Sequence, residues 1–302
     1  MAISGDILAV GAYYENTNGQ SESGRAYVFN AKSGALISTL TSPHTQFGGL
    51  FGISVGISGN LIAVGAPTEN ASGYIQAGHA YLFNAKTGAL VRTFTSPNVQ
   101  YMGYFGYCVA ISGNVVAICA PQENASGYQF AGHAYIFNSS TGALVSTLTS
   151  PNAQWMGYFG DSIATDSKIV EVGAAIETVS GYLAAGRAYS FNASTGAYIR
   201  TLTSPNTQTG GWFGASVSVN PGIIVVGAPR ETASGHGIAG HVYSFNSTTG
   251  ALIDALASPN AKYYGWFGNS VAANGEKVIV GAPLETADGK SDAGHAYIFG
   301  DP

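Results

Sequence analysis

Charged side chains are scarce in this sequence: Asp, Glu, Lys and Arg make up 9% of its 302 residues, and the formal net charge is −5. No cluster of Lys and Arg occurs along the chain, which argues against a nucleic acid as partner, because phosphate backbones are bound by basic patches. Long apolar runs are also missing. The longest, Leu61 to Pro67 and Ile223 to Pro229, fall far short of the ~20 residues of a membrane helix, so we expect no membrane insertion.

Cysteine and helical periodicity are equally sparse. Two cysteines, Cys108 and Cys119, are too few for a disulfide framework. No stretch combines an apolar period of 3.6 residues with helix caps, so we expect almost no helix. Gly5 and Asp6 interrupt the first residues, and no signal peptide is recognisable there. The abundant residues are Gly, Val, Ile, Tyr, Phe and Thr, a mixture that favours strands broken by tight turns.

One unit of 54 residues repeats along the whole chain, as the Val-Gly-Ala glycines Gly11 and Gly65 illustrate. A Phe-Gly pair and a Gly-(His/Arg)-(Ala/Val)-Tyr-X-Phe motif return at the same interval, without insertions. A fixed period of this size is typical of repeat architectures. We expect a single domain over residues 1–302, built from the copies 1–50, 51–104, 105–158, 159–212, 213–266 and 267–302.

The copy 51–104 predicts four strands, A to D, over residues 51–57, 61–66, 79–83 and 89–95. Strand B is apolar at nearly every position, a pattern that indicates burial on both faces. A sheet packed between two neighbouring sheets meets this condition. Repeats of four short strands are typical of β-propellers. We therefore predict an all-β fold, a six-bladed β-propeller of four-stranded antiparallel blades.

The repeated motifs resemble a known family. Phe-Gly-X-Ser-Val, a turn, Leu-Ile-X-Val-Gly-Ala-Pro and Ala-Gly-X-Ala-Tyr-X-Phe are similar to the FG-GAP repeat of integrin α-subunits and of bacterial and archaeal surface proteins. The resemblance covers the chain. It implies a propeller, an extracellular or cell-surface setting, and binding or adhesion rather than catalysis. Integrin blades carry an Asp-rich calcium loop between strands A and B, whereas Ser58-Gly59-Asn60 here has too few carboxylates for such a cage. That family usually has seven blades, and this chain has six units.

The two ends of the chain predict an incomplete last blade. The first copy begins inside strand A, at Met1 to Ile3, and the last ends after strand C, at Phe299. We therefore expect 23 strands, with Ala296 to Phe299 as an open edge. Open edges invite pairing with another chain, so a homo-oligomer through this edge is one expected partnership.

The antiparallel order places the long B–C loops and the D–A links between blades at one end of each blade, and we predict that this end binds the ligand. Exposed aromatic rings on the links, beside glutamines, are candidates for stacking on sugars, because Tyr and Trp favour sites with one wet end. Packing between blades is the alternative reading. The candidate ligand residues are Phe47, Tyr101, Trp155, Tyr263, Gln100 and Gln154.

A Glu after strand B and a His or Arg at the start of strand C recur in all six copies. A ring of metal-binding pairs is one interpretation. We favour a structural clamp on each B–C hairpin, because Arg is not a metal ligand, and we expect no metal and no cofactor. The pairs are Glu15–Arg25, Glu69–His79, Glu123–His133, Glu177–Arg187, Glu231–His241 and Glu285–His295.

Signals of catalysis are weak. Gly52-Ile53-Ser54-Val55-Gly56 matches Gly-X-Ser-X-Gly, but that motif needs a strand–turn–helix elbow and Ser54 is expected within strand A. We predict no enzyme. Cys108 should face Cys119 across the A–B hairpin, within reach of a disulfide. Two small buried thiols are the interpretation that we favour.

Three functions remain, in order of preference. The first is an extracellular scaffold that binds a protein or a surface polymer. The second is a multivalent lectin with sugar sites at the aromatic links. The third, an enzyme at the mouth of the central channel, ranks last because the near-identical blades offer no asymmetric polar cluster.

Overall fold

A computed structural model describes residues 1–275 and 277–300 of the chain. These residues contain twenty-three β-strands. Helices are absent from these residues. The strands form six antiparallel sheets, which are the blades of a six-bladed β-propeller, as the repeat predicts. The chain divides into two compact units, Met1–Trp155 with Ser194–Gly196, and Met156–Ala193 with Ala197–Pro302. Whether the two units form one domain stays a prediction.

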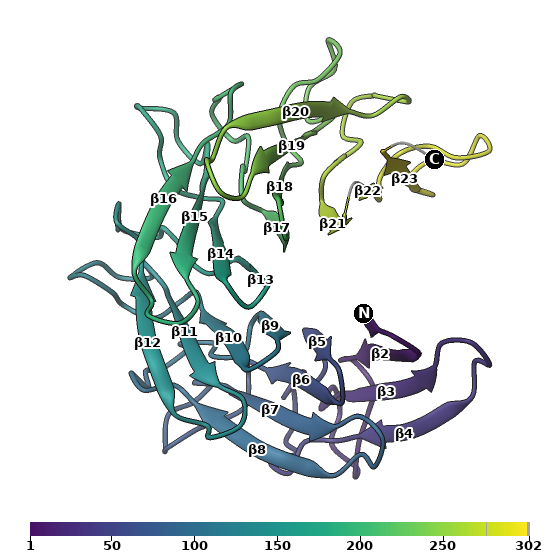
Figure 1. Cartoon of the computed structure of the whole chain (residues 1–302), viewed down its shortest axis with the longest axis vertical. Helices are drawn as coiled ribbons and strands as arrows, with labels where there is room; N and C mark the ends of the chain where they lie inside the picture. The colour runs from purple at the N-terminus through teal and green to yellow at the C-terminus, as the bar shows by residue number, and fades with distance from the viewer. Residues whose placement is uncertain (276, 301–302) are drawn as a thin grey trace. The chain divides into compact units, whose positions relative to one another are not determined.

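The first unit holds blades 1 to 3, each with its strands hydrogen-bonded in chain order (Figure 1). The strands are β1 (Ala2–Ser4), β2 (Ile7–Ala12), β3 (Arg25–Asn30), β4 (Leu36–Leu40), β5 (Val55–Ser58), β6 (Leu61–Ala66), β7 (His79–Asn84), β8 (Leu90–Thr95), β9 (Val109–Ser112), β10 (Val115–Ala120), β11 (His133–Asn138) and β12 (Leu144–Thr149).

The second unit holds blades 4 to 6 in the same arrangement. The strands are β13 (Ser162–Thr165), β14 (Ile169–Ala174), β15 (Arg187–Asn192), β16 (Tyr198–Leu202), β17 (Ser216–Asn220), β18 (Ile223–Ala228), β19 (His241–Asn246), β20 (Leu252–Ala257), β21 (Ser270–Asn274), β22 (Lys277–Ala282) and β23 (His295–Phe299).

Strand B forms the core of each blade. In blades 2 to 5, every residue of this strand after the first is buried, which the unbroken apolar pattern predicts. In blade 6 the strand β22 alternates instead, and Ile279 is 46% exposed. Within each unit the A strands of adjacent blades lie side by side. The D strand of each four-stranded blade forms the other edge of its sheet (Figure 1).

Strand A is shorter than predicted. In blade 2 it begins at Val55, not at Phe51, because the Phe-Gly pair leaves the sheet to bind the preceding blade. Phe51 is fully buried and its N–H donates to the Ser23 carbonyl at 3.0 Å. Gly52 has φ +93° and lies so close to Gly11 that a Cβ on Gly11 would meet the Gly52 carbonyl oxygen at 1.8 Å. The glycines of the two motifs therefore mark the contact between successive blades.

The last blade has three strands, β21 to β23, and β23 is its edge strand. This confirms the predicted count of 23 strands in the described residues. Ile298 on this edge strand is 70% exposed. Association of copies through this edge stays a prediction.

Candidate functional site

The B–C loop and the D–A link of a blade are joined by backbone hydrogen bonds. In blade 2 the N–H of Met102 donates to the Ile75 carbonyl and the N–H of Phe105 donates to the Ala77 carbonyl, both at 2.9 Å. Equivalent bonds occur in blades 1, 4 and 5. Because the strands are antiparallel, both segments leave the blade at the same end. Together they form a surface that each blade repeats.

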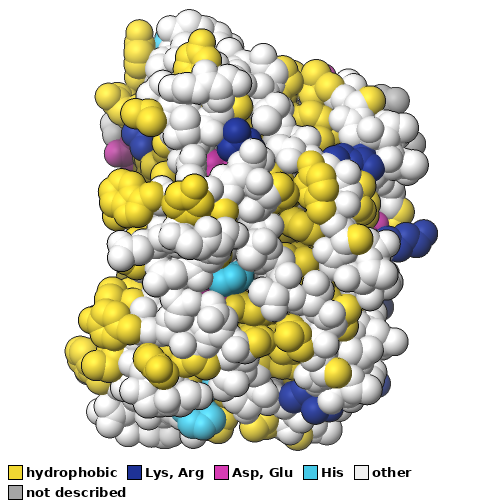
Figure 2. All heavy atoms as spheres, turned by 90° about the vertical axis from the view of Figure 1, so that its left-hand side faces the viewer, with side chains coloured by type: hydrophobic (Ala, Val, Ile, Leu, Met, Phe, Trp, Pro, Cys, Tyr) yellow, Lys and Arg dark blue, Asp and Glu magenta, His cyan; other side chains and the backbone are white. Residues whose placement is uncertain are grey.

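The aromatic residues predicted to contact a ligand all lie at the protein surface. Phe47 is 72% exposed, Tyr101 and Trp155 are each 62% exposed, and Tyr263 is 63% exposed. Thr209 holds this position in the remaining link. On the face shown in Figure 2, hydrophobic side chains reach the surface in separate groups between backbone and uncharged side chains, and charged side chains are few.

The second aromatic position of each link has a packing role. Its side chains are half-buried and all have positive φ, from 49° to 59°. A left-handed backbone is costly for a bulky residue and persists only where the surroundings hold it. The residues are Leu50, Tyr104, Tyr158, Trp212 and Trp266.

The link glutamines hold the links in place. The Nε2 of Gln100 donates to the Asn124 carbonyl at 3.2 Å, and its Oε1 accepts a hydrogen bond from the Asn124 N–H at 2.9 Å. Gln46 likewise donates to the Thr68 carbonyl at 3.1 Å. Each amide thus joins a link to the B–C loop of the next blade. Gln154, half-buried before Trp155, occupies the same position of the repeat.

Hollows adjoin two of the exposed rings. A cavity of about 420 Å³ is lined by Tyr101, Tyr74, Gln122, Asn124 and Phe130. A second one, of about 310 Å³, is lined by Phe47 together with residues of the blade 2 loop. Sequence reasoning missed Tyr74, which is 49% exposed. The signal that could have found it is a tyrosine at the same loop position of three successive copies, Tyr74, Tyr128 and Tyr182.

The predicted pairs of Glu with His or Arg lie side by side in all six blades. The shortest nitrogen–oxygen distance is 2.9 Å at His133–Glu123, and the longest is 3.9 Å at Arg25–Glu15. The other four pairs, Glu69–His79, Glu177–Arg187, Glu231–His241 and Glu285–His295, lie at 3.0 to 3.1 Å. The Glu side chain is fully buried in five of the pairs, and Glu15 is the exception.

A tyrosine that sequence reasoning missed completes each pair. Tyr81 donates its O–H to Oε2 of Glu69, and Tyr135 donates likewise to Glu123. Burial, together with the adjacent carboxylate charge, raises the pKa of Tyr81 and Tyr135, so each phenol stays a donor. The tyrosine is the invariant Tyr of the Gly-(His/Arg)-(Ala/Val)-Tyr-X-Phe motif, and its constancy was the available signal.

One group of three side chains in the described part of the chain has the composition of a metal site. His44, Glu69 and His79 each offer a ligand atom, and these atoms lie within 4.8 Å of one another. His44 was not among the candidates from the sequence.

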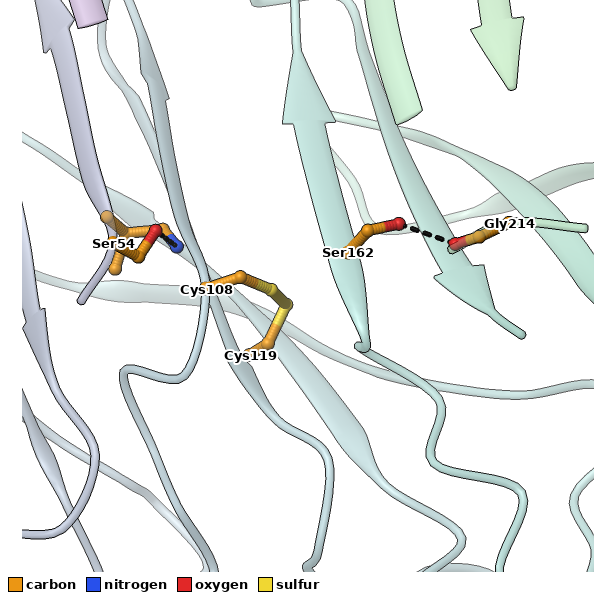
Figure 3. The surroundings of a disulfide bond; sticks show 6 residues. Ser54, Cys108, Cys119, Ser162 and Gly214 are labelled. Atoms are coloured by element: carbon orange, nitrogen blue, oxygen red, sulfur yellow. Dashed lines mark hydrogen bonds between the residues drawn. A yellow bond between two sulfur atoms is a disulfide. The ribbon is translucent and has the colours of Figure 1, made fainter. Parts of the chain in front are cut away.

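Cys108 and Cys119 form a disulfide between β10 and the segment before β9, so the preference for two free thiols was wrong (Figure 3). Their Cα atoms are 5.2 Å apart, and the predicted pairing across the hairpin is confirmed. In blade 4 the same positions hold Ser162 and Gly173, and Ser162 donates to the Gly214 carbonyl at 2.8 Å.

Ser54, the serine of the Gly-X-Ser-X-Gly match, also has a structural partner. It lies just before β5 rather than within it, and its Oγ accepts a hydrogen bond from the Val109 N–H at 3.0 Å.

Comparison with known proteins identifies the repeat. The family model of the FG-GAP repeat matches residues 1–29, 36–83, 91–137 and 255–299, more than half of the chain. No curated protein matches the sequence. Within the described residues, no helix is long and apolar enough to cross a membrane.

Proposed function

Because the chain belongs to the FG-GAP repeat family, we propose that it is a non-catalytic binding module that acts outside the cell or at its surface. Its ligand is a protein or a surface polymer. The ligand binds the blade ends formed by the B–C loops and the D–A links, defined above.

The observation that carries this proposal is an exposed aromatic ring at one position of four of the five links. A ring such as Phe47, 72% exposed, contributes nothing to the core. Aromatic side chains are enriched at binding interfaces because they bury a large area at a low entropic cost. The glutamines before Phe47 and Tyr101 join their links to the B–C loop of the next blade, so these two rings stand on a preorganised backbone.

A multivalent lectin is the second candidate, and the cavity beside Tyr101 favours it. This cavity is lined by the aromatic residues Tyr74 and Tyr101 and by the amide residues Gln122 and Asn124. An aromatic face with amide groups beside it suits a sugar, whose ring is apolar on its faces and polar at its edge.

Binding of a fluorescently labelled chain to intact cells tests both candidates. Treating the cells with protease should abolish binding if the ligand is a protein, and periodate should abolish it if the ligand is a glycan. A glycan array provides the direct test of the lectin. The proposal fails if the labelled chain binds neither cells nor glycans.

The double variant Phe47→Thr, Tyr101→Thr locates the site, and Thr209 shows that this position accepts threonine. We expect at least about a tenfold loss of affinity, because each removed ring is worth about 1 kcal/mol or more in a contact. The matched control is Leu90→Thr, Leu144→Thr, which alters exposed apolar residues on the D strands β8 and β12. Equal losses in the two double variants would contradict the proposed binding surface.

A further inference from the structure

His44 is the one histidine at a position that holds asparagine in the other links. It follows Ser-Pro after strand D, where the other copies have Asn98, Asn152, Asn206 and Asn260. These asparagines include donors to the buried Glu–Tyr pair, since Asn260 Nδ2 lies 2.9 Å from the Tyr297 oxygen and Asn206 Nδ2 lies 3.4 Å from Glu231 Oε2. The link between blades 1 and 2 therefore brings an imidazole to a place where the repeat has an amide.

The imidazole of His44 lies against the Glu69–His79 pair. Its Nδ1 is 3.0 Å from the Tyr81 oxygen. Its ring stacks on that of His79, with centroids 4.7 Å apart and planes 8° from parallel. His79 Nδ1 is in turn 3.0 Å from Glu69 Oε2. Two imidazoles and one carboxylate thus lie close together, and one ligand atom from each lies within 4.8 Å of the other two.

The carboxylate of Glu69 has a free acceptor. The side chain is fully buried, and its Oε2 receives the Tyr81 O–H. Its Oε1 is buried without a hydrogen-bond partner. A buried carboxylate oxygen without a partner has lost its hydration without compensation, and a cation bound there would be stabilised.

We propose that His44, Glu69 and His79 bind a divalent transition-metal ion, with Zn²⁺ as the reference ion. Two imidazole nitrogens and one carboxylate oxygen are ligands typical of zinc and its neighbours, and three protein ligands leave a position open. This site departs from the expectation, drawn from the repeated Glu–His pairs alone, that the chain holds no metal.

Binding requires one movement, and the structure indicates which side chain makes it. A metal ion lies in the plane of each ring that ligates it, so two parallel stacked rings cannot share an ion until one of them turns. His79 is 5% exposed and fixed against Glu69, whereas His44 lies at the surface. His44 therefore turns, exchanging its contact with Tyr81 for the metal.

The site adjoins the proposed ligand surface. Glu69 stands between Thr68 and Asn70, which line the 310 Å³ cavity together with Phe47. A bound ion would place its open coordination position near that cavity, within one link and one loop of the first unit.

Zinc titration of the full chain, purified without a polyhistidine tag, tests the site by competition with a chromophoric chelator. We expect one Zn²⁺ per chain. His44→Asn should weaken binding at least tenfold, and so should His79→Arg. Both replacements are residues that the repeat itself uses, as Asn98 and Arg187 show, so the melting temperature without metal should stay unchanged.

A gain-of-site variant completes the test. Asn206→His places an imidazole beside the Glu231–His241 pair, whose nitrogen–oxygen distance is 3.1 Å and whose Glu231 Oε1 is likewise buried without a hydrogen-bond partner, and should raise the stoichiometry to two Zn²⁺ per chain. Equal zinc binding by the wild type and His44→Asn would overturn the proposal. The proposal would also be overturned if the wild type bound no Zn²⁺ at about 1 mM, a concentration at which even weak specific sites are occupied.

Discussion

Replacing Glu171 with glutamine tests how much a buried carboxyl group lowers the stability of one blade. Glu171 lies on β14, fully buried, where other blades have Ala63, Ala117 or Val225. Its Oε2 accepts a hydrogen bond from Ser190 at 2.6 Å, and its Oε1 has no hydrogen-bond partner. Burial raises the pKa of Glu171 from its ordinary value of 4.5 to about 8, although the Ser190 bond and the Arg200 charge act against this rise.

The pH dependence follows from this raised pKa. Below pH 4.5 the carboxyl group is protonated in both the folded and the unfolded chain, so it causes no penalty. Between pH 4.5 and about 8 the unfolded chain releases the proton and the folded chain keeps it, so stability falls as the pH rises. One pKa unit corresponds to about 1.4 kcal/mol, and the full difference amounts to about 5 kcal/mol above pH 8. Glu171→Gln has no proton to release and should escape this loss.

Urea unfolding of the wild type and of Glu171→Gln at pH 5 and at pH 9 measures the effect. We expect the variant to gain stability over the wild type at pH 9 by several kcal/mol more than at pH 5. The matched control is Glu22→Gln, which makes the same chemical change on an exposed loop residue and should show no such gain. An equal stability difference between Glu171→Gln and the wild type at both pH values would refute the reasoning.

Two further predictions concern single contacts. The double variant Cys108→Ser, Cys119→Gly restores the residues of the other blades, and loss of the disulfide should lower the free energy of unfolding by about 2–3 kcal/mol, as expected for a short closed loop. Reductant should destabilise the wild type by a similar amount in urea unfolding; a disulfide without effect on either would contradict this. Tyr81→Phe removes a donor from the buried Glu69 and should cost about 1–3 kcal/mol. Tyr27→Phe, beside the half-exposed Glu15, should cost clearly less in the same thermal or urea melts, and equal costs would argue against burial as the cause.

Much of the fold follows from the sequence because the repeat constrains it. Strand B of blade 2, predicted over Leu61–Ala66, has those bounds in the structure, since an unbroken apolar run ends at a proline. Strand A was predicted four residues too long at its start, because the Phe-Gly pair looks like strand sequence but contacts the preceding blade instead. Contacts between repeats leave no local pattern, so such boundaries are beyond single-sequence reasoning.

The candidate site was likewise predictable from the sequence only in part. Columns of similar residues pointed to the Glu–His pairs and to Phe47 and Tyr101, and the structure places them as pairs and as exposed rings. His44 escaped notice because it is an exception to its column, and its neighbours come from another blade. The glutamine amides bond to backbone, which residue type alone does not reveal.

The constant length of the links has a consequence for how weak contacts combine. Phe47 and Tyr101 occupy equivalent positions 54 residues apart in the sequence, so under the proposed function each would make a similar weak contact with a polymer of repeating chemistry. Once one such contact has formed, the next forms at a high effective concentration, so several weak contacts together give a high avidity. A single soluble unit of such a polymer would then bind with low affinity, whereas the whole polymer would bind with high avidity.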